Sequence, residues 1–190
     1  MPKRLIFAAL LTACLAPAAS AGLLPGVVTR MTAGASTEFH YAAVLPTDSQ
    51  LKVGNRFTIY DFAGYVPGSE RAPDGWSFGL ANVGPTPIET DPVDNPSVPN
   101  LSWTYSGPVV EGGKPLGDFG ADSVFFDTTA AYFTAVTWTL KDRVDTNITT
   151  TLVPVGTSVV GPTVPEPATL LMAAVGLPLV GLVGRFRSRS

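Results

Sequence analysis

Apolar and polar side chains alternate along much of the middle of the chain. Residues 101–105 place Leu101, Trp103 and Tyr105 on one face, and residues 131–141 repeat the same period of two. This period is typical of a β-strand with one buried face. Alternation or a β-branched composition predicts strands at residues 37–45, 51–62, 76–83, 101–105, 123–127, 131–141, 147–153 and 157–160.

The connections between these strands indicate the architecture. Residues 51–62 form either one strand kinked at Gly54 and Asn55 or a hairpin that turns there. Residues 85–99 contain five prolines, which excludes a central strand and predicts a long exposed loop crossing between sheets. No long amphipathic helical pattern occurs in this region. The prediction is therefore an all-β fold, a jelly-roll-like antiparallel β-sandwich, over residues 22–160.

The first residues have the three parts of a secretory signal. Two basic residues precede an apolar run at 5–18, and the small residues Ala19 and Ala21 then form a cleavage site. This pattern predicts a cleavable signal helix over residues 1–21. The sequence around Cys14 also resembles a lipobox, which leaves lipidation at that cysteine as an alternative.

The C-terminal end is apolar and then basic. After a linker at 161–167, residues 168–184 carry no charge and would span about 25 Å as a helix. We expect a transmembrane helix at 168–184 and a basic cytoplasmic tail at 185–190, because basic residues stay inside. The arginines that anchor this tail are Arg185, Arg187 and Arg189.

Pro165, Glu166 and Pro167 precede the apolar segment, and two prolines hold such a segment extended for recognition. This motif, one apolar helix and a basic tail together resemble the PEP-CTERM sorting signal of Gram-negative bacteria. The resemblance implies export by the secretion machinery, inner-membrane anchoring, and processing by an exosortase near the motif. It also implies a cell-surface or extracellular location and an association with exopolysaccharide and biofilm. The alternative is a simple membrane anchor with an accidental motif.

Composition and charge change once these ends are set aside. The 190 residues are 45% hydrophobic, and the mean hydropathy is +0.27, to which the two terminal segments contribute most. The net charge of −3 becomes about −7 between residues 22 and 160, where seven basic residues face fourteen acidic ones. A nucleic-acid partner is therefore excluded. One cysteine and one histidine exclude an intrachain disulfide and a site with two imidazoles.

The sequence shows no catalytic constellation. His40 lies in a predicted strand beside Glu38, where a single histidine is usually structural, and no serine has the Gly-x-Ser-x-Gly context. Oxygen ligands at 91–95 and 118–122 match no known calcium loop. We therefore expect a non-enzymatic protein with no cofactor and no metal.

Two alternative functions remain at this stage. A carbohydrate-binding module would stack sugars on Trp76, Trp103 and Trp138, although these side chains are equally suited to a sandwich core. A secreted hydrolase would need two convergent carboxylates in a cleft. The candidates are Glu38, Asp61, Glu70, Asp74, Asp118, Asp122 and Asp127.

Overall fold

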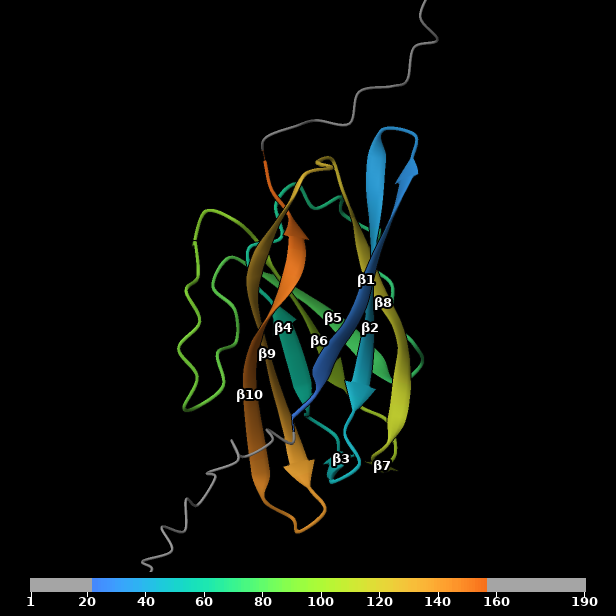
Figure 1. The fold of residues 1–190 in the computed structure, drawn as a ribbon, viewed down its shortest axis with the longest axis vertical. Helices are drawn as coiled ribbons and strands as arrows, with labels where there is room; N and C mark the ends of the chain where they lie inside the picture. The colour runs from blue at the N-terminus through green and yellow to red at the C-terminus, as the bar shows by residue number, and fades with distance from the viewer. Residues whose placement is uncertain (1–21, 157–190) are drawn as a thin grey trace, which may run out of the picture.

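Two antiparallel β-sheets pack face to face in the computed structural model, which describes residues 22–156 (Figure 1). Within these residues one sheet has three strands in the order β1-β2-β8. The other has seven, in the order β5-β6-β4-β9-β3-β7 with β10 paired to β9. The strands are β1 (Leu24–Ala33), β2 (Ser36–Leu45), β3 (Ser49–Leu51), β4 (Arg56–Ile59), β5 (Trp76–Ala81), β6 (Asn100–Tyr105), β7 (Val110–Glu111), β8 (Lys114–Ser123), β9 (Thr128–Thr139) and β10 (Val144–Pro154).

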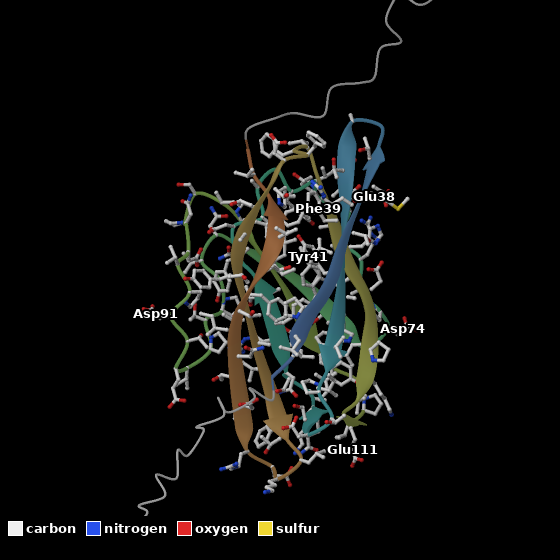
Figure 2. All side chains as sticks on the ribbon, viewed as in Figure 1. Glu38, Phe39, Tyr41, Asp74, Asp91 and Glu111 are labelled. Atoms are coloured by element: carbon white, nitrogen blue, oxygen red, sulfur yellow. The ribbon has the colours of Figure 1, made fainter. Side chains whose placement is uncertain are left out.

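The core between the sheets is built from the inward side chains of alternating strands. Phe39 and Tyr41 of β2 are buried and lie between the two layers (Figure 2). Phe57 of β4 stacks on Trp103 with ring centroids 5.1 Å apart, and the Phe119 ring meets it edge-on at 4.9 Å. Because these rings come from both sheets, they join the layers through apolar and aromatic contact. The predicted all-β sandwich is confirmed, and the finer jelly-roll likeness stays a prediction.

The segment predicted at 51–62 follows one edge of β9 as two short strands. Gln50 of β3 pairs with Trp138, and Arg56 of β4 pairs with Val136. Both strands run antiparallel to β9, so the kinked-strand alternative is confirmed and the hairpin is wrong. At the interruption Gly54 has φ +87°, a left-handed conformation that glycine adopts without steric cost.

Other strand predictions need correction. Residues 123–127 were expected to be a strand, but β8 ends at Ser123 and residues 124–127 form the turn into β9. Strands β1 and β8 were not expected. In β8 the buried positions lie mainly in its second half, and its two glycines and one proline obscure the alternation. In β1 the pairing register shifts between Pro25 and Val28, which breaks the period of two.

The proline-rich segment predicted as a long loop at 85–99 contains no strand, and the loop begins earlier, at residue 82. The expectation that it crosses between sheets is wrong, because it joins β5 and β6, which are neighbours in one sheet. The Tyr60 hydroxyl lies 3.4 Å from the Pro85 carbonyl oxygen, and Asn100 Nδ2 donates to Asp94 Oδ1 at 2.9 Å. The loop is therefore tied to the sheet that it leaves.

Predictions for residues 1–21 and 157–190 lie outside the described part of the chain. They comprise the signal helix and its cleavage site, the edge strand at 157–160, the linker, the transmembrane helix and the basic tail. Between residues 22 and 156, no helix has the length and apolar character to cross a bilayer.

Candidate functional site

Charged side chains gather on the outer face of the three-stranded sheet. Phe39 of β2 points into the core, so its neighbours Glu38 and His40 point outward. Pairing of β2 with β8 sets Asp122 opposite Glu38, and Asp118 opposite Ala42. Glu38 is seen projecting from β2 in Figure 2. We call Glu38, His40, Arg71, Asp118 and Asp122 the His40 cluster.

Both ring nitrogens of His40 face carboxylates. Nδ1 lies 2.6 Å from Asp118 Oδ2, and Nε2 lies 3.2 Å from Glu38 Oε2. The hydrogen bond to Asp118 is the main cause that raises the pKa of His40, and partial burial opposes it. The ring thus links neighbouring strands β2 and β8 most strongly when it is protonated.

Arg71 reaches the cluster from the segment that follows β4. Its Nη2 donates to Asp122 Oδ1 at 2.9 Å, and its backbone pairs with Gly120 of β8 on both sides. A Cβ at Gly120 would lie 3.3 Å from Arg71 Nε and 2.5 Å from the Phe39 carbonyl oxygen. Glycine at this position therefore lets the guanidinium lie close over the strand.

This arrangement has part of the geometry of a general base. A histidine oriented by an aspartate can deprotonate a nucleophile through its second nitrogen. In this protein the second nitrogen faces Glu38, so the contact favours an imidazolium held between two carboxylates. Across residues 22–156, no group of three or more histidine, cysteine, aspartate or glutamate side chains is arranged to hold a metal ion.

The other acidic residues weighed for hydrolysis lie outside the His40 cluster. Glu70 accepts a hydrogen bond from Tyr65. Burial, together with this hydrogen bond, raises the pKa of Tyr65 to about 12. Asp61 accepts from the Asn95 backbone, and burial is the main cause that raises its pKa. Figure 2 shows Asp74 on the opposite side of the molecule from Asp91.

In both segments considered for calcium, carboxylates contact other groups of the protein. Asp118 and Asp122 contact His40 and Arg71, respectively. In the 91–95 segment, Asp94 accepts hydrogen bonds from Asn100 Nδ2 and the Gly84 backbone. The sequence indicates both segments through their oxygen atoms. It contains no signal for the partners of Asp118 and Asp122, which lie 78 and 51 positions away in the chain.

The three tryptophans do not form a row. Trp103 is fully buried, and its Nε1 donates to the Arg71 carbonyl oxygen at 3.2 Å, so it has no surface on which a sugar could stack. Trp76 packs against Tyr105 and Phe119 at the margin of the core. Strand alternation places Trp138 on the opposite face of the same sheet, since its neighbour Thr137 is buried. A three-tryptophan platform is therefore excluded.

Trp138 belongs to a second surface, which we call the β9–β10 face. The pairing of β9 with β10 aligns the outward side chains of the two strands, and these side chains are uncharged. They are Ala130, Tyr132, Val136 and Trp138 on β9, and Val144, Thr146, Ile148, Thr150 and Leu152 on β10. Thr134 has the same orientation on β9 but is fully buried, and its hydroxyl lies 3.3 Å from that of Tyr60. At its border the Lys52 ammonium lies 4.6 Å from the Trp138 ring centroid and 2.6 Å from Asp142 Oδ1.

A surface pocket lies next to this border, at the turn between β9 and β10. It is lined by Asp48, Thr139, Leu140, Lys141 and Arg143. One carboxylate and two cations line it, so it does not bring together the pair of carboxylates that glycoside hydrolysis requires.

Comparison with protein families identifies a PEP-CTERM protein-sorting motif at residues 163–189. The match includes Pro165, Glu166 and Pro167 and the three arginines of the tail. The motif marks the chain as an exported protein that is anchored in a membrane and then processed by an exosortase. No curated protein matches the chain.

Proposed function

We propose that this chain is a non-enzymatic protein of the cell surface or extracellular matrix of a Gram-negative bacterium, associated with exopolysaccharide. The observation that carries the proposal is the sorting motif at 163–189. An exosortase is the processing partner that this motif implies. The described sandwich would then be the part that persists outside the cell after processing.

The His40 cluster supports a role without catalysis. Asp118 and Glu38 occupy both nitrogens of the imidazole, at 2.6 and 3.2 Å. A general base needs one nitrogen turned toward the substrate or a nucleophile. The cluster is better suited to joining β2 to β8 on a sheet surface than to proton transfer.

The decisive experiment removes residues 164–190 and follows the protein by cell fractionation and by its mass. We expect the full chain to mature to a shorter product at the surface or in the medium. The truncated chain should lose membrane association and exosortase-dependent processing. Replacing Arg189 by Lys is a matched control, because it keeps the charge of the tail. Unchanged processing and retention of the truncated chain would refute the sorting proposal.

A second candidate function is binding of a glycan chain, and the β9–β10 face favours it. This face carries Trp138, Tyr132 and several threonines without a charge, whereas the domain as a whole is acidic. Aromatic rings stack on the apolar faces of sugars, and threonine hydroxyls can bond to sugar hydroxyls. A neutral polysaccharide would not meet the repulsion that an anionic ligand would.

Affinity electrophoresis in the organism's own exopolysaccharide tests this candidate. Trp138→Ala should weaken binding by at least about tenfold, because buried aromatic anchors dominate such contacts. Val109→Ala, at a position that is 60% exposed, is the control. Equal mobility of the two variants would count against glycan binding, and release of reducing ends by the protein would instead indicate a hydrolase.

A further inference from the structure

The described chain ends beside an apolar turn. Val155 donates its backbone N–H to the Asp127 carbonyl oxygen at 2.9 Å, and a Cβ at Gly156 would lie 3.3 Å from the Phe125 ring. In Figure 1 the end of β10, the connection from β8 to β9 and the β1–β2 hairpin lie at one end of the sandwich. The turn from β9 to β10 lies at the other end. We call residues 124–127 the exit turn.

The backbone atoms of the exit turn are held in place by hydrogen bonds. Val124 N donates to the Gly64 carbonyl oxygen at 2.9 Å, and Phe125 N donates to Ser123 Oγ at 2.9 Å. Arg30 Nη1 donates to the Phe126 carbonyl oxygen at 3.0 Å. These hydrogen bonds would form with any side chain at position 126.

The side chains of the turn are nevertheless apolar and exposed. Phe126 is 49% exposed and Val124 is 37% exposed. Scattered exposed apolar residues are common in folded proteins, so their place on the molecule is the informative feature. Here they adjoin the point where the chain leaves the domain, next to the guanidinium of Arg30. Asp127 is the acidic residue of the turn.

The length of the following chain brings this end close to a membrane. Eleven residues, 157–167, separate the described domain from the apolar segment of the sorting motif. Such a segment spans at most about 40 Å. Before processing, the exit turn is therefore held near the bilayer at a high effective concentration, of millimolar order for short linkers. Under these conditions even a small apolar contact is populated.

We propose that the exit turn docks on the lipid surface of the membrane that anchors the chain. Phe126 and Val124 enter the interface. Arg30, whose positive charge opposes the acidic character of the rest of the domain, contacts lipid phosphates. The anchor already places the Pro165–Pro167 motif at the membrane surface, and docking holds the folded domain next to it, where the exosortase works. After cleavage the tether is lost, and two side chains are too small a contact to retain the domain. This inference rests on the membrane anchoring in the proposed function.

Lipid-dependent quenching tests the contact in the full chain. Cys14→Ser removes the native cysteine, and Val124→Cys carries a polarity-sensitive fluorophore. The vesicles contain phosphatidylethanolamine, phosphatidylglycerol and a lipid-attached quencher. Val53→Cys is the matched control, since Val53 is 71% exposed and follows β3, which pairs with β9 near its turn into β10. We expect quenching at position 124 and little at 53, and Phe126→Ser should reduce the quenching at 124.

The outcomes separate the contact from the anchor. Failure of the chain to float with the vesicles would refute the anchoring. Flotation with equal quenching at both positions, or with none at 124, would overturn the docking proposal.

Processing in cells supplies a second measurement. Phe126→Ser should slow maturation by about three- to tenfold, whereas Val53→Ser should not. A slowed maturation with no lipid quenching would assign the turn to a contact with the exosortase and overturn the lipid proposal. Thermal unfolding of each variant verifies that the fold is retained.

Discussion

The two outer faces of the sandwich are chemically opposite although they share one core. On the three-stranded sheet, Glu38, His40, Arg71, Asp118 and Asp122 form a cluster of ionisable groups. On the seven-stranded sheet, the β9–β10 face presents aromatic, aliphatic and threonine side chains. The chemistry of each outer face is determined by its outward side chains, which alternate with the core positions along each strand.

This difference shows where function can be sought in a small β-sandwich. The inward residues are constrained by packing, so they say little about what the protein does. The outward residues are free to differ, and here one set forms internal ion pairs. The other set leaves hydroxyls and rings available to a neutral partner. The charged face thus contributes to stability, and the uncharged face is the better candidate for binding.

The largest expected effect comes from the core beneath both faces. Trp103→Ala should reduce the free energy of unfolding by about 3–5 kcal/mol, because it leaves a large cavity and removes one of the two hydrogen bonds that the Arg71 carbonyl oxygen accepts. Denaturant unfolding measures the loss. Trp138→Ala on the β9–β10 face should cost much less. Equal losses would contradict the separation of core from outer face.

A smaller effect on the free energy of unfolding distinguishes an ion pair of the His40 cluster from one at the border of the β9–β10 face. Arg71→Ala should reduce the free energy of unfolding by about 1–2 kcal/mol, because Asp122 is only 17% exposed and loses a charged donor.

The matched control for this variant is Lys52→Ala. Its partner Asp142 is 73% exposed, so we expect no measurable change in the free energy of unfolding. The same unfolding experiment measures both variants. A larger loss for Lys52→Ala would mean that the border of the β9–β10 face depends on charge as much as the His40 cluster does.

Sequence reasoning predicted those parts of the fold in which local pattern determines structure. Residues 101–105 alternate strictly, and their odd members are buried as expected. Strand β1 was missed because its register shift interrupts the alternation. The strand predicted at 123–127 is wrong because the aromatic residues that favour a strand in this segment lie in a turn. The Phe126 side chain in fact lies at the exposed exit turn.

The functional features likewise differ in whether a local sequence pattern reveals them. A sorting motif is linear, so Pro165, Glu166 and Pro167 are visible in the sequence, and the family comparison confirms the motif. The His40 cluster is not linear. Asp118 reaches His40 across 78 positions of the chain, through a strand pairing that no local pattern specifies. The sequence showed His40 and Glu38 side by side but had no signal for Arg71.

The smallest expected effect is the pH dependence of the charged face. The folded protein raises the pKa of His40 above the ordinary value of 6.5, mainly through Asp118. The protonated ring therefore stabilises the fold fully below pH 6.5, and this contribution is lost as the pH rises through the folded-state pKa. We expect wild type to exceed His40→Gln in stability by about 0.2–1 kcal/mol at low pH, the range for exposed ion pairs.

Thermal unfolding of both proteins across this pH range measures the difference. It should shrink with rising pH and also with added salt, which screens exposed charges. Thr146→Gln on the β9–β10 face is the control and should show no such trend, because its neighbours on that face do not ionise in this range. A difference that grows with pH would mean that neutral His40 is the stabilising form. In that case the imidazole would be free to act as a base, and the contrast between a structural and a binding face would fail.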